Sequence, residues 1–325
     1  MKTTRRVTIV LSFVLAVVLM YIIIARAGFG DIAVQLKNAQ YRLILLMLVI
    51  YTADMLLRAV RWQQILAESG TKVGLKDSFL AYNLGNSLNI IIPVKIGDLA
   101  RSYYLKSKHG YRYSETIPAT ILDRVFDVIG VYVVVLLCSI YVVTKVQLAG
   151  WFYYLMITGI AVLIAVFIFF EIAYKYRRKL ERIKKRELRV FIHKLFDVFS
   201  GSVKNRARFI MLIVYSIVIW LLEGVAAYYV FAAMSYTISL PVIMFAVMAA
   251  TLAKAIPITP GGVGVFEGTL ILVLSMFGYG SRIIGIISTI FHFLMNLYGI
   301  LIGMYALIKE NISISKIKFE KVDDR

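Results

Sequence analysis

Ionisable side chains occur inside several of the most apolar stretches of this chain. They are Asp54, Arg58, Lys95, Asp98, Arg101, Asp123, Arg124, Asp127, Glu223, Lys254 and Glu267. A charge at the centre of a bilayer costs about 2.5 to 3.5 kcal/mol even on a lenient insertion scale, so each of these residues needs a partner or a role. The cations could hold a phosphate by charge-assisted hydrogen bonds, and the acids could balance the cations or carry protons.

Part of this charge has a structural explanation. Asp54 and Arg58 are one helical turn apart, as are Asp123 and Asp127, with Arg124 beside them. Residues at this spacing can form ion pairs along one helix. A purely structural role is less expected for the residues that flank broken backbone, which are Lys95, Arg101, Lys254 and Glu267.

The broken backbone is most evident from Pro257 to Glu267, where prolines and glycines interrupt two short apolar segments. Residues 240–256 rise about 25 Å as a helix, against about 30 Å of hydrocarbon, so this segment must turn back. Free backbone groups at that depth must line a protein cavity. A second break runs from Asn89 to Arg101 and contains Pro93. Two broken segments in matching halves predict a substrate site at the midplane of the membrane.

The amino-acid composition indicates the class of protein in which these residues are placed. With 61% hydrophobic residues, 17% charged residues and a mean hydropathy of +0.82 over 325 residues, the chain is predicted to be an all-α polytopic membrane protein. Spans are expected at residues 7–25, 41–60, 118–143, 151–174, 209–233 and 282–308. The first could instead be a secretory signal, but it is longer than the usual core of about 7 to 15 residues.

Each half therefore has three spanning helices plus a broken re-entrant helical hairpin. Three crossings is an odd number, so the halves are expected to be two inverted repeats: residues 1–146, residues 147–310, and then a cytoplasmic tail at 311–325. Lysine and arginine gather on alternate ends of the spans, which places both termini in the cytoplasm and the protein in the cell membrane.

The basic loop at residues 175–208 carries apolar residues at helical spacing, among them Phe191, Phe196 and Phe199. We expect an amphipathic helix that binds anionic lipids of the inner leaflet. The net charge of +19 could also suggest nucleic acid, but no nucleic-acid-binding fold is indicated and no such partner is expected.

Motifs for catalysis or cofactors are weak. Gly262, Gly264 and Gly268 only superficially resemble a phosphate-binding loop, because the spacing is wrong and no strand precedes them. A single cysteine and three histidines share no metal-ligand spacing, so no metal or cofactor is expected. His292 is expected to be a packed residue, whereas Glu223 is left open between a structural and a functional role.

The broken segments also carry a family resemblance. Asn89 to Arg101, then Asp123, Arg124 and Asp127, then Pro257 to Gly268, with Arg58, Arg61 and Trp62 upstream, resemble the transmembrane region of lysylphosphatidylglycerol synthases. That group is described as flippase-like. Lys95 stands where the family usually has arginine, and Asp98 where it usually has glutamate. Larger members add an acyltransferase-like or glycosyltransferase domain, and this chain is expected to lack both.

The resemblance implies translocation of an anionic or headgroup-modified lipid, of phospholipid or polyprenyl-phosphate type. The predicted site residues are Lys95, Asp98, Arg101, Asp123, Arg124, Asp127, Lys254, Pro257, Pro260, Gly261, Gly262, Gly264 and Glu267. One alternative is the membrane part of a lipid-modifying transferase such as phosphatidylglycerol lysyltransferase. Another is a membrane anchor for a separate synthase or glycosyltransferase partner.

Overall fold

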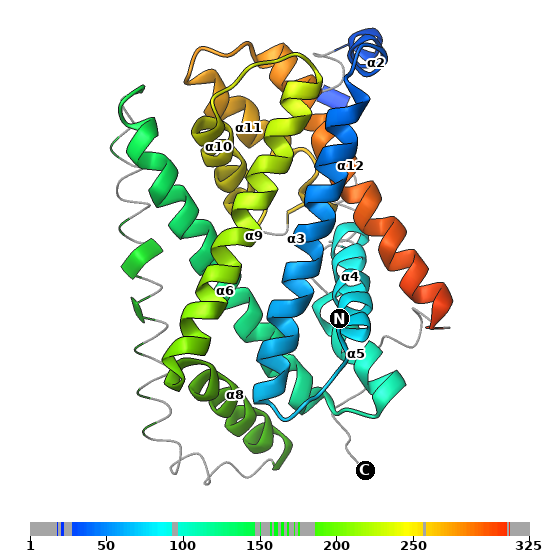
Figure 1. The fold of residues 1–325 in the computed structure, drawn as a ribbon, viewed down its shortest axis with the longest axis vertical. Helices are drawn as coiled ribbons and strands as arrows, with labels where there is room; N and C mark the ends of the chain where they lie inside the picture. The colour runs from blue at the N-terminus through cyan, green and yellow to red at the C-terminus, as the bar shows by residue number, and fades with distance from the viewer. Residues whose placement is uncertain are drawn as a thin grey trace.

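The computed structural model describes residues 28–92, 97–146, 186–255 and 258–310, with isolated positions in 18–22 and 150–175 and at 312. Every regular element in these ranges is helical (Figure 1). Four helices are long and apolar enough to cross a membrane. The expected all-α class is thereby confirmed.

The four long helices coincide with four of the predicted spans. They are α3 (Tyr41–Glu68), α6 (Tyr113–Val142), α9 (Arg206–Ala233) and α12 (Ser281–Lys309). All four are longer than expected, most clearly α3, which continues eight residues past the predicted end, and α6, which begins five residues before the predicted start. The predicted spans at 7–25 and 151–174 lie outside the continuously described residues.

The first broken segment is a hairpin of two helices, α4 (Leu75–Ile91) and α5 (Gly97–His109). The 17 residues of α4 rise about 26 Å, less than the hydrocarbon thickness. The two helices cross closely at Gly85 and Gly97, because a Cβ on Gly97 would come within 1.9 Å of the Gly85 carbonyl oxygen. Pro93 and Lys95 lie outside the described residues.

The second broken segment consists of α10 (Leu240–Ala253), the 3-10 turn η2 (Pro260–Gly262) and α11 (Val265–Ser275). The 14 residues of α10 rise only about 21 Å, so this helix also ends within the thickness of a bilayer. Pro257 lies outside the described residues. Both predicted breaks are therefore present as helix, break and returning helix.

The two hairpins lie toward opposite ends of the bundle (Figure 1). The α4–α5 hairpin is on the side of α8 (Arg186–Lys204), and α10–α11 is on the side of α2 (Phe29–Lys37). Helix α3 packs along α9, α4 packs against α12, and α10 packs against α6. Each hairpin thus contacts the last long helix of the other half of the chain.

The predicted amphipathic segment is helical, as α8. Phe196 and Phe199 are buried, and α8 packs against α6 and α3. Lys194 donates to the carbonyl oxygen of Ser69 at 3.1 Å, beyond the end of α3. Protein therefore covers this part of the apolar face of α8, which leaves less of it for lipid than the sequence suggested.

The buried residues form two apolar clusters. Along α3 the first cluster includes Met55 and the second includes Ala59. Along α6 the second cluster extends to Phe126 and the first cluster begins at Val131. Along α9 the second cluster includes Leu212 and the first cluster begins at Ile219. Each change occurs near the middle of a helix of 28 to 30 residues. Polar side chains at these positions lie at mid-depth in the bundle.

Candidate functional site

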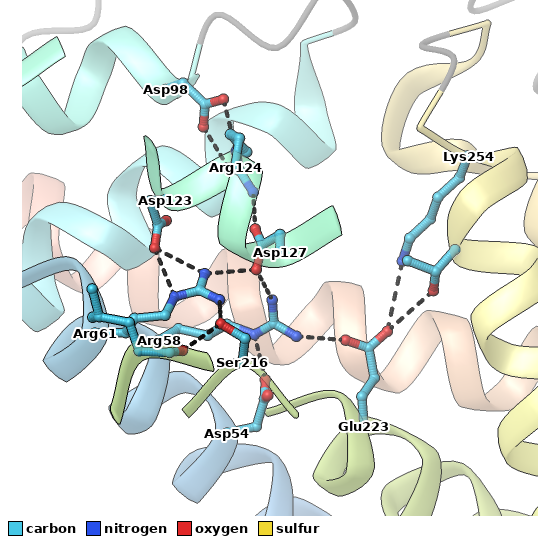
Figure 2. A network of polar contacts seen from close by, with 12 residues as sticks. Asp54, Arg58, Arg61, Asp98, Asp123, Arg124, Asp127, Ser216, Glu223 and Lys254 are labelled. Atoms are coloured by element: carbon cyan, nitrogen blue, oxygen red, sulfur yellow. Dashed lines mark hydrogen bonds and ion pairs between the residues drawn. The ribbon is translucent and has the colours of Figure 1, made fainter. Parts of the chain in front are cut away.

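Helices α3, α6 and α9 carry a layer of charged and polar side chains between the two apolar clusters. The members are Asp54, Arg58, Arg61, Asp123, Arg124, Asp127, Ser216 and Glu223, all of them buried except the half-buried Arg124. Figure 2 shows that they form one continuous network. Because breaking one partner from a buried ion pair leaves an uncompensated charge, these residues hold one another in place.

Arg61 is the most enclosed member of the network. Its Nε donates to Asp123 at 2.9 Å, its Nη2 to Asp127 at 2.6 Å, and its Nη1 to the Ser216 hydroxyl at 2.8 Å. The side chain is 0% exposed. Arg61 therefore ties α3, α6 and α9 together and has no surface left for a ligand.

Arg58 connects the two halves of the chain. Its Nε donates to Asp54 at 2.8 Å, and its Nη2 donates to Glu223 of α9 at 2.8 Å. The guanidinium lies 4.4 Å from the ring centroid of Trp220. Glu223, which the sequence left undecided, is thus a carboxylate of the second half that pairs with an arginine of α3.

The first hairpin joins the network through Asp98, in the first turn of α5. Arg124 donates to both oxygens of Asp98, at 2.6 and 3.1 Å, and to Asp127 at 2.9 Å. Asn89 on α4 donates to Asp98 at 3.0 Å and accepts the Gly97 backbone N–H at 2.8 Å. The N-terminus of α5 is therefore capped by its own hairpin.

Arg101 occupies a closed position behind the site. Its Nη1 donates to Asp123 at 3.1 Å, and its guanidinium lies 3.8 Å from the ring centroid of Tyr82. The side chain is 0% exposed. Although Arg101 was predicted to hold a headgroup, its place is within the protein, supporting Asp123.

Lys254 is more accessible than these arginines. It follows the last residue of α10, and its Nζ lies 4.0 Å from Glu223 and 4.9 Å from the ring centroid of Phe266. The side chain is 27% exposed. Thr251 donates to the same Glu223 oxygen at 3.5 Å. Lys254 is held loosely enough for a competing anion to take the place of Glu223.

The turn after Lys254 depends on its glycines. Gly261 has φ 61° and Gly262 has φ 75°, a region that other residues rarely adopt. The Thr259 hydroxyl donates to the Val263 carbonyl at 2.8 Å and closes the turn. A Cβ on Gly262 would lie 2.8 Å from Cβ of Lys254. The turn and the lysine therefore pack directly on each other.

A cavity of about 350 Å³ lies between the two hairpins. Its charged and polar lining residues are Tyr51, Arg58, Tyr82, Asn86, Asn89, Asp98, Arg124, Asp127, Glu223, Thr251, Lys254, Thr259, His292 and Asn296. Apolar residues such as Val128 and Leu252 complete the wall. Within the described part of the chain, no three histidine, cysteine or acidic side chains are grouped as a metal site would require.

The structure brings many of the predicted site residues to this cavity. Asp98, Arg124, Asp127, Lys254, Gly261 and Gly262 line it. Asp123 and Arg101 stand behind it as ion-pair partners, and Pro260 belongs to the buried turn. Gly264 and Glu267 cap α11, since the Gly264 N–H donates to Glu267 at 2.7 Å.

Several residues of the cavity were not among the predicted site residues. Tyr82, Asn86 and Asn89 recur at helical spacing on α4, and His292 and Asn296 are one turn apart on α12. Polar side chains at this spacing on otherwise apolar helices share one face. That signal was available, but only packing shows that the two faces meet.

The sequence profile described as the transmembrane region of lysylphosphatidylglycerol synthase matches residues 9–303. This match covers most of the chain. The chain belongs to that family. Together with the four long apolar helices, membership makes it an integral membrane protein of the lysylphosphatidylglycerol synthase transmembrane family.

Several archaeal proteins are similar to this family member. The glycosyltransferase AglD of Haloferax volcanii is 27% identical over 305 residues, which cover 82% of this chain and 48% of that protein. A UPF0104 membrane protein of Methanothermobacter thermautotrophicus is 26% identical over 287 residues, 82% of this chain and 84% of the relative. A UPF0104 membrane protein of Pyrococcus horikoshii is 26% identical, covering 79% and 84%. The chain thus spans about half the length of the Haloferax protein.

Proposed function

We propose that this protein binds the anionic headgroup of a membrane lipid in the cavity between its two hairpins and moves that lipid between leaflets. The observation that carries the proposal is the position of Lys254. It is an accessible cation at the broken end of α10, in the cavity at mid-depth, and the nearest described carboxylate is 4.0 Å away. Charge at this depth is too costly to be retained without a role.

The charges of the site are balanced, so a bound anion would have to take the place of a carboxylate at one cation. The described network pairs its cations Arg58, Arg61, Arg101, Arg124 and Lys254 with the carboxylates Asp54, Asp98, Asp123, Asp127 and Glu223. A phosphate that displaces Glu223 from Lys254 would gain a charge-assisted hydrogen bond and leave Glu223 paired with Arg58. The four aspartates of the network keep their arginine partners. Headgroup binding would therefore disturb one weak pair.

Movement between leaflets would use the two hairpins. They lie toward opposite ends of the bundle, and each packs on the last long helix of the other half, the pattern expected of two inverted repeats (Figure 1). Residues 1–146 and 147–310 would be those repeats. Alternating access would then open the cavity first past α4–α5 and later past α10–α11, with the glycine turn before α11 as a hinge.

The orientation that we propose places the α8 end in the cytoplasm of the cell membrane, together with both termini. Lysine and arginine are concentrated at that end, in residues 72–76, 106–112 and 186–208. The part of α8 that protein does not cover would contact anionic lipids of the inner leaflet.

A second candidate function is membrane support for lipid-linked glycosylation. It rests on the similarity to the glycosyltransferase AglD, which extends over 82% of this chain. In this case the cavity would hold the lipid-linked substrate for a separate glycosyltransferase. The protein would then co-purify with that enzyme and would move no lipid by itself.

The test is lipid binding and transport by purified protein in reconstituted vesicles. Lys254→Gln removes the cation, and Lys254→Arg keeps it. The charge-neutral variant should bind phosphatidylglycerol more weakly by about 1.5 to 3 kcal/mol, the range for hydrogen bonds to charged groups, and should transport it more slowly. Lys37→Gln, at an exposed position on α2, is the matched control. Wild-type binding and transport by Lys254→Gln would refute the proposed site.

A further inference from the structure

His292 on α12 is held by an acid from the second hairpin. Its Nδ1 lies 2.7 Å from Oε1 of Glu267, and its ring centroid lies 4.5 Å from that of Phe266. The side chain is 2% exposed. Because an ionised carboxylate only accepts hydrogen bonds, Nδ1 must carry the hydrogen. The other ring nitrogen, Nε2, is therefore the one that remains for a further hydrogen bond.

Nε2 of His292 is buried and has no hydrogen-bond partner, although His292 lines the cavity. Buried polar atoms without a partner are uncommon in native structures. Since Nδ1 is directed at Glu267, Nε2 on the other side of the ring is directed away from α11. The hydrogen-bonding capacity of Nε2 is therefore open to an occupant of the cavity that His292 lines.

We infer that Nε2 of His292 binds an anionic oxygen of the headgroup, of the phosphate class, and that Glu267 positions the ring for this contact. The inference rests on the proposed headgroup site and adds a ligand group from α12. As an imidazolium, His292 donates from both nitrogens, to Glu267 and to the phosphate oxygen. The added proton is taken up from the bulk solvent. It raises the net charge of the His292–Glu267 pair by one, which offsets part of the negative charge of the phosphate.

The same contact connects the ligand to the hairpin. The second oxygen of Glu267, Oε2, accepts the backbone N–H of Gly264 at 2.7 Å, at the start of α11. A ligand that orders His292 would thus also order Glu267 and the turn before α11. Binding in the cavity and the conformation of the second hairpin are coupled through two hydrogen bonds.

Other charged groups of the cavity come from five further helices. They are Arg58 of α3, Asp98 of α5, Arg124 and Asp127 of α6, Glu223 of α9, and Lys254 after α10. The wall from α4 supplies Asn86 and Asn89 without charge. A response of His292 to a ligand must therefore be observed at the imidazole itself.

The low number of histidines makes that observation possible. The chain has three, so His109→Gln with His193→Gln leaves His292 as the sole histidine. The ¹⁵N-histidine NMR spectrum of this variant in dodecyl maltoside, a detergent without phosphate, would report each ring nitrogen. Separate samples would receive phosphatidylglycerol, inorganic phosphate, or diacylglycerol of the same acyl chains. Binding of phosphatidylglycerol would be measured in parallel.

We expect phosphatidylglycerol to move the Nε2 resonance to the protonated, hydrogen-bonded range, and diacylglycerol to leave it unchanged. A response to inorganic phosphate as well would identify phosphate as the recognised group. A response to inorganic phosphate alone would support His292 as a phosphate ligand but would contradict lipid as its source. An unchanged Nε2 in a protein that still binds phosphatidylglycerol through Lys254 would overturn the inference and leave the proposed function standing. A protein that binds no phosphatidylglycerol would overturn both.

Variants separate the ligand role from packing. His292→Phe should reduce the affinity for phosphatidylglycerol about tenfold or more, while His292→Gln, which keeps a donor, should lose less. Glu267→Gln should abolish the Nε2 response even where the fold is retained. Phe293→Leu, at an exposed position of α12 outside the cavity lining, is the control and should bind normally. Wild-type affinity in His292→Phe would show that the ring is only packed.

Discussion

Arg58 and Glu223 are 165 positions apart in the sequence and meet at 2.8 Å between Nη2 and Oε2, at mid-depth in the bundle. The pair joins α3 to α9, the two helices that pack along each other at the centre of the fold. Arg58 also keeps Asp54 neutralised, and Glu223 is the nearest carboxylate to Lys254. This ion pair thus holds the two halves of the chain together, and its carboxylate also lies beside the cation of the cavity.

Removing Arg58 should cost more stability than removing the charge of Glu223. Arg58→Gln leaves two buried carboxylates unneutralised, which costs about 3 to 5 kcal/mol. In Glu223→Gln, the new amide oxygen could still accept from Arg58 while Asp54 balances the guanidinium. The double variant should lose less than the sum of the two, by about 0.5 to 3 kcal/mol. Thermal unfolding in detergent measures all three, with Arg42→Gln at an exposed position of α3 as the control. Additive losses would show that the pair is not coupled.

A methyl group added at Gly262 should disrupt the glycine turn, whereas a methyl group added at Gly268 should be tolerated. Gly262→Ala places a side chain at φ 75° and 2.8 Å from Cβ of Lys254, which costs about 1 to 2 kcal/mol for the backbone alone. Gly268→Ala meets nothing within 4 Å. We expect lipid transport to fall strongly in the first variant and to persist in the second. Equal activity would argue against a required turn conformation.

Lys108, in the last turn of α5, joins the first hairpin to the residue that follows α12. Its Nζ donates at 2.8 Å both to Asp77, in the first turn of α4, and to Glu310, after α12. Those hydrogen bonds, first to Asp77 and then to Glu310, raise the pKa of Lys108. A raised pKa contributes stability below the unfolded value of about 10.4 and loses it only as the pH rises through the folded value.

Lys108→Gln should therefore loosen α5 by the same amount at about pH 7 and about pH 9, since both lie below that unfolded value. Each exposed pair is worth only about 0.2 to 1 kcal/mol, and salt should weaken it. Hydrogen exchange of the α5 amides, with Lys72→Gln as an exposed control, measures the change. Exchange that is insensitive to the substitution would exclude a fastening role.

The proposed orientation can be tested with a single cysteine. Cys138 is buried and is the only cysteine of the sequence, so Cys138→Ala provides the background. Gly74→Cys, between α3 and α4, should be labelled only from the cytoplasm, and Gly280→Cys, before α12, only from outside. Both positions are exposed. Labelling of both from one side would contradict the placement of the hairpins toward opposite membrane faces.

The sequence by itself determined the helical membrane class, four of the spans and both broken hairpins. These follow from local properties, because a helix needs a fixed length of apolar residues to cross hydrocarbon, and proline and glycine interrupt it wherever they occur. The need for partners for Asp54, Arg58, Asp123 and Asp127 was equally local, since a buried charge is costly in any fold.

The partners themselves were decided by tertiary structure. Spacing along one helix pairs Asp54 with Arg58, as expected, but it cannot show that Arg61 takes both Asp123 and Asp127, or that Glu223 accepts from Arg58. The closed position of Arg101 and the contact of His292 with Glu267 likewise depend on which helix faces are adjacent. The direction and burial of a long side chain follow from the packing of several helices, and that information is not present in any one segment of the chain.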